Sequence, residues 1–300
     1  MSPVVFALHG HEALCRIIAE CLDGEVGNLT LRRFPDGETY VRLETGVEGR
    51  PVILLCSMND PDAKILQLYF TGVAARELGA TAVGLVAPYL TYMRQDKRFQ
   101  PGEAVTSSSF ARLLCGFVDW LVTVDPHLHR HASLAELYTV PATVVHAAPA
   151  VSDWIRTNIE SPVLIGPDEE SAQWVSEVAR GAGVPYAVLQ KIRMGDRDVE
   201  VSVPDVQVWR NHTPVLVDDI ISTGRTMIET LGHLQRAGMK PAVCVGVHAV
   251  FAGDAYEDLL AAGAARVATC NTISHRSNVI DLSGAILSAT QTHVAGQSGG

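Results

Sequence analysis

Long hydrophobic runs and paired cysteines are absent from this 300-residue sequence. No run approaches the ~18 apolar residues of a membrane span, because the nearest one, residues 242–252, contains His248. The amino terminus has no basic region followed by an apolar core, so no secretory signal is expected. These absences favour a cytoplasmic protein with no membrane partner. The six cysteines form no Cys-x-x-Cys pair and lie among apolar residues, which favours buried free thiols over a disulfide framework or a zinc site: Cys15, Cys21, Cys56, Cys115, Cys244 and Cys270.

Positive charge is also scarce. The chain has 23 Lys and Arg against 33 Asp and Glu, a formal net charge of −10, which opposes the long-range attraction on which nucleic-acid binding depends. No nucleic-acid partner is expected, and anionic substrates must be held by local arrangements and metal ions. The length corresponds to about two domains, and a hydrophobic content of 47% is ordinary for a soluble α/β protein.

The most informative stretch is Pro-Val-Leu-Val-Asp-Asp-Ile-Ile-Ser-Thr-Gly-Arg-Thr at residues 214–226. Residues 215–217 are typical of a short buried strand, and apolar residues recur at helical spacing from Met227, so the polar residues between them are expected to form a strand-to-helix turn. An anion at such a turn gains hydrogen bonds from backbone N–H groups and the favourable end of the helix dipole. Gly224 lets the backbone approach a ligand closely. Hydroxyl donors are supplied by Ser222, Thr223 and Thr226.

Asp218 and Asp219 distinguish this turn from a generic phosphate loop. Two acids beside an anion site repel the ligand unless they accept hydrogen bonds from sugar hydroxyls or face a divalent cation. The alternative is an acidic helix cap, but the strand before and the Ser-Thr-Gly-x-Thr after favour a sugar phosphate or magnesium. The stretch resembles the ribose-phosphate binding loop shared by phosphoribosyltransferases and ribose-phosphate pyrophosphokinases. The loop alone does not choose between them.

Strands and helices alternate along both halves of the chain, which predicts the α/β class with parallel sheets covered on both faces. Strands are expected at residues 4–8, 52–56, 82–86, 120–124, 163–165, 186–189, 215–217, 242–247 and 267–270, and helices at 13–22, 63–78, 110–117, 169–180 and 226–236. A junction within residues 141–150 predicts domains 1–145 and 146–300. Residues 120–125 and 214–219 are both apolar strands ending in acid, which indicates an internal duplication. The polar tail from Ser288 is expected to fray.

A projecting hairpin is expected at Phe34-Pro35-Asp36-Gly37-Glu38, between strand-like residues 29–34 and 39–43. Pro presets φ and Gly supplies a positive φ, so Pro-Asp-Gly is a turn signal. Taken alone, its Phe is more often a packing residue than a ligand contact.

Further segments match one family in order along nearly the whole chain. They are the 34–38 hairpin, Pro-Tyr-x-x-Tyr-x-Arg-Gln-Asp at 88–96, Val-Asp-x-His at 124–127 and Pro167-Asp168. With the 214–226 loop they resemble ribose-phosphate pyrophosphokinase, whereas a phosphoribosyltransferase shares only that loop. The resemblance implies two similar phosphoribosyltransferase-like domains, each a mainly parallel sheet flanked by helices. It also implies Mg²⁺ as cofactor, ATP and ribose 5-phosphate as substrates, and a homo-oligomer, either dimer or hexamer.

The resemblance also implies residue roles. ATP would be bound by Phe34, Asp36 and Glu38 of a neighbouring subunit and by Arg94, Gln95 and Asp96. Metal and ATP phosphates would lie at Asp125 and His127, with Asp168 near the ribose or its magnesium. Ribose 5-phosphate would be bound by Asp168, Asp218, Asp219, Ser222, Thr223, Gly224, Arg225 and Thr226. The catalytic residues would be Lys191, Arg193 and His127, with the first two on a mobile loop.

The chain departs from the family pattern at residues 128–138, where the family usually continues with a Gln-Ile-Gln-Gly-Phe-Phe-like segment, and at Arg225, where a small residue is common. His127-x-His129-x-His131 also permits a zinc site, although Pro126 breaks a regular strand and no further ligand cluster is visible. Two other functions stay open: a phosphoribosyltransferase, and a catalytically silent regulatory paralogue that keeps the fold.

Overall fold

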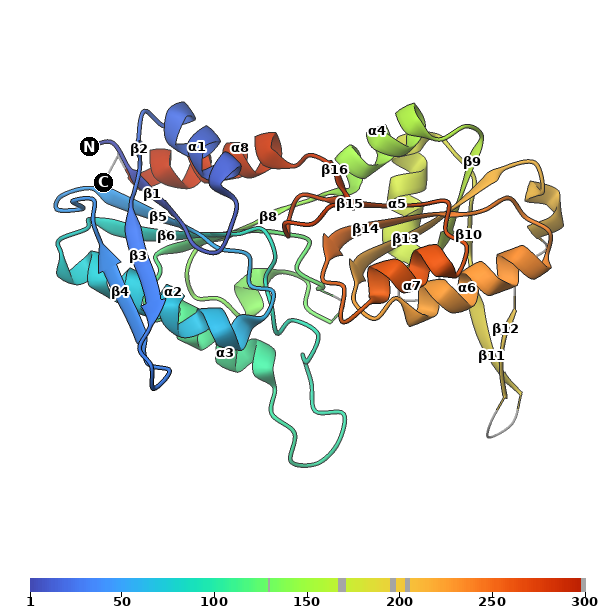
Figure 1. The fold of residues 1–300 in the computed structure, drawn as a ribbon, viewed down its shortest axis with the longest axis horizontal. Coiled ribbons are helices and arrows are strands. Elements are labelled where there is room, and N and C mark those ends of the chain that lie inside the picture. The colour runs from blue at the N-terminus through green and yellow to red at the C-terminus, as the bar shows by residue number, and fades with distance from the viewer. Residues whose placement is uncertain (129, 167–170, 195–197, 203–205, 298–300) are drawn as a thin grey trace. The chain divides into compact units, whose positions relative to one another are not determined.

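The computed structural model describes residues 1–128, 130–166, 171–194, 198–202 and 206–297, which form two compact α/β units (Figure 1). One unit contains residues 1–145 together with the segment that starts at Ser283, and the other contains His146–Leu282. The expected assignment of the whole carboxyl-terminal part to the second domain is therefore wrong, because the last helix belongs to the first unit. None of the helices formed by the described residues is long and apolar enough to cross a membrane.

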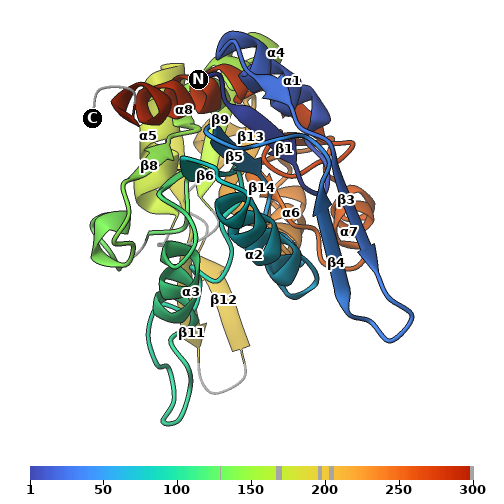
Figure 2. The ribbon, with the colours of Figure 1, turned by 90° about the vertical axis from the view of Figure 1, so that its left-hand side faces the viewer.

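The first unit is built on a six-stranded sheet in the order β2-β1-β5-β6-β7-β8, in which all neighbours are parallel. Its strands are β1 (Val4–Ala7), β2 (Glu25–Val26), β5 (Pro51–Leu55), β6 (Ala82–Ala87), β7 (Trp120–Val124) and β8 (Ala142–Val145). Helices α1 (Glu12–Cys21) and α8 (Ser283–Gln297) cover one face, and α2 (Pro61–Glu77) and α3 (Thr106–Cys115) cover the other (Figures 1 and 2). The inner strands β6 and β7 are buried along their whole length because both faces of the sheet are covered.

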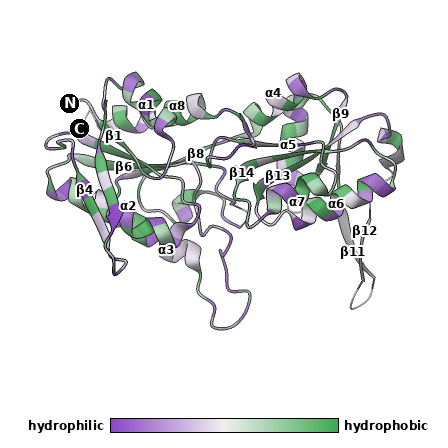
Figure 3. Ribbon diagram, in the orientation of Figure 1, coloured by the Kyte–Doolittle hydropathy of each residue, from purple (hydrophilic) through white to green (hydrophobic). Residues whose placement is uncertain are grey.

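The second unit repeats this plan with the order β10-β9-β13-β14-β15-β16, again with parallel neighbours. Its strands are β9 (Pro162–Gly166), β10 (Tyr186–Val188), β13 (Thr213–Ile221), β14 (Val243–Ala249), β15 (Arg266–Cys270) and β16 (Asn278–Ile280). Its helices α4 (Ala148–Asn158) and α5 (Ala172–Ala182) cover one face, and α6 (Arg225–Arg236) and α7 (Ala255–Ala261) cover the other. Figure 3 shows hydrophobic residues concentrated on the central strands of both sheets. The predicted α/β class with two similar parallel sheets is confirmed.

Two hairpins accompany the sheets. Strands β3 (Leu29–Arg33) and β4 (Thr39–Leu43) pair antiparallel around the Pro-Asp-Gly turn, as the sequence predicts, and β4 packs against α2. Strands β11 (Gln190–Met194) and β12 (Asp198–Ser202) form a second antiparallel pair where a loop was expected. Short 3₁₀ turns, η1 (Leu134–Glu136) and η2 (Val206–Trp209), complete the described elements.

All six cysteines are free. Cys15, Cys56, Cys244 and Cys270 are buried as expected, whereas Cys115 is half-buried and Cys21 is exposed. Burial raises the pKa of Cys56 and of Cys244 to about 12, so these thiols stay protonated and unreactive at neutral pH.

Helix α8 is fastened to the first sheet by His293. The imidazole stacks on the Trp120 ring at 5.0 Å between centroids, and its Nε2 lies 2.9 Å from the Thr143 hydroxyl. Gly84 on the neighbouring strand makes room for the indole, because a Cβ at this position would lie 1.9 Å from Trp120. Thr290, one turn before His293, is fully buried, so the expected fraying from Ser288 does not occur through Gln297.

We predict that the attachment of α8 depends on pH through His293. Burial lowers the pKa of His293 below its ordinary value of 6.5, so the unfolded chain takes up a proton more readily than the folded chain. The His293 contribution to stability is therefore complete above pH ~6.5 and is lost as the pH falls toward the lowered folded-state pKa. Urea unfolding of the wild type and of His293→Gln at pH 8 and pH 5.5 tests this, and the wild type should lose more stability on acidification. An equal loss in both proteins would contradict it.

Candidate functional site

Backbone strain is concentrated at one edge of the first sheet. Non-glycine residues with positive φ follow each of the four inner strands: His9 and His11 after β1, Asp60 after β5, Tyr92 after β6, and Asp125 and His127 after β7. Such conformations cost free energy and persist where the surrounding structure imposes them, often at functional sites. The carboxyl edge of a parallel sheet is also where open α/β proteins bind ligands. This edge is the candidate site of the first unit.

The Val-Asp-x-His segment forms a tight turn directly after β7. Asp125 has φ 29° and His127 has φ 52°, and the His127 N–H donates to the Asp125 carbonyl at 2.9 Å. The Asp125 N–H donates to Val145 on the adjacent strand, which fixes the start of the turn. The structure thus places Asp125 and His127 together at the candidate edge, both half-buried.

The Arg-Gln-Asp segment follows β6, the neighbour of β7 in the sheet. Arg94 is exposed. The Gln95 carbonyl accepts the N–H of Ser107 at 3.4 Å, which ties the segment to the start of α3. Asp96 has a side chain that is 3% exposed, and both its carboxylate oxygens lie 3.1 Å from Nη1 of Arg130. Asp96 is therefore held within the protein by Arg130, which sequence analysis did not identify because it lies in the stretch that departs from the family pattern.

The β3–β4 hairpin carries its predicted ligand residues on the surface. Phe34 is 37% exposed and lies perpendicular to Tyr40, and the Arg32 guanidinium lies 4.5 Å from the centre of the Phe34 ring. The N–H of Glu38 donates to the Asp36 carboxylate at 3.2 Å across the turn, where Gly37 has φ +93°. The hairpin therefore presents an aromatic ring and two acids away from the core of its own unit.

A second polar group at the same edge was not predicted. His11 Nε2 lies 2.9 Å from the Ser57 hydroxyl, and Lys64 Nζ donates to the Ser57 carbonyl and to Asn59 Oδ1. Burial lowers the pKa of Lys64, and burial together with the nearby Lys64 charge lowers the pKa of His9. His9-Gly10-His11 directly after a strand is the sequence signal that identifies this group.

The acids of the second unit lie on a strand that extends beyond its apolar run. Strand β13 continues to Ile221, whereas the sequence indicated an end at Val217. The extension occurs because β14 is equally long at this end, where Asp218 pairs with Gly246 and Ile221 with Ala249. Asp218 and Asp219 therefore have backbone positions set by the sheet, and the Asp219 N–H donates to Asp218 Oδ1 at 2.9 Å.

The turn after β13 has the geometry expected of an anion site. Gly224 has φ +67° and precedes the first residue of α6, and that helix start has no side-chain cap. A Cβ on Gly224 would lie 3.3 Å from Leu259, so both conformation and space favour glycine. The β14–α7 connection supports the turn, since Phe251 N–H donates to the Ile221 carbonyl and Ala252 N–H to the Ser222 carbonyl. Uncapped N–H groups at a helix start are suited to a phosphate. The structure brings the turn residues together at this helix start: Ser222, Thr223, Gly224, Arg225 and Thr226.

Two predicted residues are not described by the structure, and two others are described by their backbone alone. Asp168 and His129 lie outside the described residues. Lys191 and Arg193 are described by their backbone, which lies on β11 in register with Val201 and Val199.

The described residues contain no group of three or more His, Cys, Asp or Glu that could hold a metal ion. His131 directs its Nδ1 to the Glu136 carboxylate at 2.8 Å, so the zinc reading gains no support from the histidines that are described. Magnesium is usually held by one or two carboxylates together with substrate phosphates. Asp125, at the candidate edge, fits that requirement.

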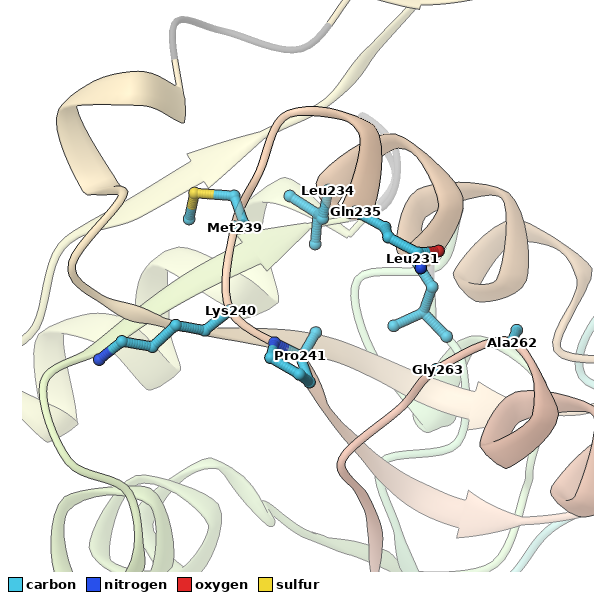
Figure 4. A pocket seen from close by; sticks show the side chains of 9 residues that line it. Leu231, Leu234, Gln235, Met239, Lys240, Pro241, Ala262 and Gly263 are labelled. Atoms are coloured by element: carbon cyan, nitrogen blue, oxygen red, sulfur yellow. The ribbon is translucent and has the colours of Figure 1, made fainter.

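A pocket in the second unit lies away from these residues (Figure 4). It is mainly apolar and adjoins the amino-terminal end of β14, the opposite end from the turn at Gly224. Its lining includes Leu231, Leu234, Met239, Lys240, Pro241 and Ala262. The pocket is therefore not part of the candidate site.

Comparisons with known proteins assign both units. Residues 3–117 match the N-terminal domain of ribose phosphate pyrophosphokinase, and residues 133–284 match the phosphoribosyl transferase domain. The chain is 37% identical to the ribose-phosphate pyrophosphokinase of Methanopyrus kandleri, with 90% of this chain and 92% of that protein covered. It is 32% identical to the same-named protein of Methanothermobacter thermautotrophicus, with 95% and 98% covered.

The structure of phosphoribosylpyrophosphate synthetase from Mycobacterium smegmatis matches with a TM-score of 0.86 and 25% identity, covering 99% of this chain and 100% of that one. The similarity therefore covers both units and is not confined to the turn at residues 222–226. The chain belongs to the ribose-phosphate pyrophosphokinase family of enzymes.

Proposed function

We propose that this protein transfers the diphosphoryl group of Mg-ATP to the anomeric hydroxyl of ribose 5-phosphate, giving 5-phosphoribosyl 1-pyrophosphate and AMP. The observation that carries the proposal is the turn at Gly224, which precedes helix α6 and follows a strand that carries two acids. The first unit has a separate candidate site, at the sheet edge where non-glycine residues have positive φ. An anion-binding turn accounts for a sugar phosphate, and the paired acids account for sugar hydroxyls. A phosphoribosyltransferase shares only the loop at residues 214–226, so that activity would leave the first unit without a role.

The two units divide the substrates between them in this proposal. Arg94 and His127, at the edge of the first sheet, bind the phosphates of ATP, with Gln95 and Asp96 in the same loop. Phe34, Asp36 and Glu38 bind the adenine of an ATP molecule held by a neighbouring subunit, because an aromatic face suits a purine and carboxylates accept from its amino group. The turn residues 222–226 bind the 5-phosphate, while Asp218, Asp219 and Asp168 orient the ribose.

The reaction requires that the two substrates are positioned next to each other and that negative charge is neutralised. It needs no covalent intermediate. The anomeric oxygen attacks the β-phosphorus, the bond from that phosphorus to the oxygen of the α-phosphate breaks, and AMP leaves. Negative charge accumulates on phosphoryl oxygens, so cationic side chains such as Lys191, Arg193 and Arg94 stabilise the transition state. Asp125, His127 and Asp168 would hold magnesium together with the ATP phosphates, and the ion would supply further neutralisation of this charge. We place this chemistry in the cytoplasm.

A direct assay tests the activity. Purified protein, magnesium, ATP and ribose 5-phosphate should yield AMP, and omission of ribose 5-phosphate should abolish it. Asp218→Asn/Asp219→Asn should remain folded and lose most of the AMP formation, because the ribose hydroxyls lose their acceptors. If the wild type releases no AMP above the ribose-free control yet binds ATP, the protein is the silent regulatory paralogue.

Lys191→Ala should lower kcat by roughly 100–1000-fold with a modest change in KM for ribose 5-phosphate. This expectation holds if Lys191 interacts with the diphosphoryl group mainly in the transition state, when the charge shifts. The interaction would then stabilise the transition state by about 2–4 kcal/mol. Lys191→Arg should not restore activity, because a planar guanidinium does not present the same compact charge. Lys240→Ala, an exposed lysine on the far side of the second unit, is the matched control. An unchanged kcat in Lys191→Ala would leave transfer to Arg193, Arg94 and the metal.

We also propose a homo-oligomer, dimer or hexamer, in which the exposed hairpin residue Phe34 completes the ATP site of a neighbour. Phe34→Ala and Lys191→Ala should each be nearly inactive alone. After mixing and subunit exchange, some sites combine an intact hairpin with an intact lysine, and activity should return to roughly a quarter of the wild-type value if dimers form at random and each site acts independently. Mixed oligomers without a gain in activity would show that Phe34 acts within its own chain.

A further inference from the structure

Arg130 and Asp96 join the loops that follow β6 and β7. Nη1 of Arg130 donates to both carboxylate oxygens of Asp96 at 3.1 Å each, although the two residues are 34 positions apart in the sequence. The contact lies within the first unit, at the edge where Asp125 and His127 have strained backbones.

The two partners differ in exposure. The Asp96 side chain is 3% exposed, and a buried carboxylate is costly unless a cation and hydrogen bonds compensate it. Arg130 supplies both, yet 41% of its own side chain is exposed. A guanidinium has five N–H donors in a rigid planar fork, and Nη1 alone makes the contact with Asp96. The contact with Asp96 therefore uses one nitrogen of the guanidinium, on a side chain that is 41% exposed.

The surroundings of Arg130 are suited to a phosphate. It is three residues after His127, so its backbone lies within about 11 Å of the Val-Asp-x-His turn. The exposed ring of Phe99 lies 5.7 Å from the Arg130 guanidinium and 5.1 Å from the Lys97 amine, so two cations adjoin one aromatic ring. The acid on this loop, Glu103, is already engaged by the N–H groups of Phe99 and Gln100.

We propose that Arg130 is a phosphate-binding residue of the ATP site and that Asp96 is the positioning residue that orients it. Asp96, which the resemblance assigns directly to ATP, then acts on the nucleotide through Arg130. The inference rests on the proposed use of ATP and adds a residue from the stretch that departs from the family pattern.

Calorimetric titration with Mg-ATP and with adenosine separates a phosphate contact from a structural one. Arg130→Gln should weaken Mg-ATP binding by roughly 10- to 100-fold, the range expected when one charge-assisted hydrogen bond is lost, and should leave adenosine binding unchanged. Arg130→Lys should recover part of the Mg-ATP affinity, since the charge returns without the planar fork. Arg112→Gln, an exposed arginine of α3 outside the site, is the control and should change neither affinity.

The positioning role of Asp96 needs a separate measurement. Asp96→Asn keeps the size of the side chain and removes its charge, so it should weaken Mg-ATP binding by a smaller factor than Arg130→Gln. Added to Arg130→Gln, it should cause no further loss, because the residue it orients is already gone. The KM for ribose 5-phosphate should change in none of these variants.

The outcomes distinguish this inference from the proposed function. An equal loss of Mg-ATP and adenosine affinity in Arg130→Gln would mean that the ion pair only holds the loop, and it would overturn the inference while leaving the function intact. Additive losses in the double variant would overturn the role assigned to Asp96. Wild-type protein that binds adenosine and Mg-ATP equally weakly would overturn the proposed function as well.

Discussion

Both units depend on the polarity of the parallel sheet. Because every strand of such a sheet runs the same way, all the loops that follow the strands emerge at one edge, whatever their distance in sequence. Asp125 and Arg94 follow neighbouring strands, so both lie at this edge of the first sheet. Asp218 lies near the corresponding edge of the second sheet. The hydrogen bonds between paired strands fix their register in the core. The same register fixes where each strand ends, and therefore where the residues of the candidate site lie.

The sheet constraint also explains where the backbone is strained. Several strands of the first sheet end in sharp turns, and Asp125 and His127 occupy the turn that follows β7. Glycine would relieve the strain but has no functional group, so histidine and aspartate occupy left-handed positions at a cost of order 1–3 kcal/mol each. The Asp125 N–H donates to Val145 on β8 and the His127 N–H donates to the Asp125 carbonyl, and these two hydrogen bonds hold the turn.

Sequence analysis correctly predicted features that depend on a local sequence pattern. The strand at residues 120–124 was predicted to the residue, and the hairpin turn and the Gly224 turn were placed correctly, because each depends on alternation, Pro-Asp-Gly or a glycine next to a helix. It missed features that depend on distant partners. The β13 strand is longer than its apolar run because β14 continues beside it, and the Asp96–Arg130 contact joins residues that share no pattern. The sequence of α8 has no amphipathic pattern, although the helix buries Thr290 and stacks His293 on Trp120 of the first sheet.

The return of α8 to the first unit makes the second unit an insertion, since the chain leaves the first unit after Val145 and re-enters it at Ser283. During synthesis, the sheet of the first unit is finished when β8 emerges, but Trp120 lacks its contact with α8 while the next 137 residues are translated. All the strands of the second unit are translated between Val145 and Ser283, so its core can be completed before α8 is made. The first unit, although it begins the chain, is therefore completed only after the whole second unit has been translated.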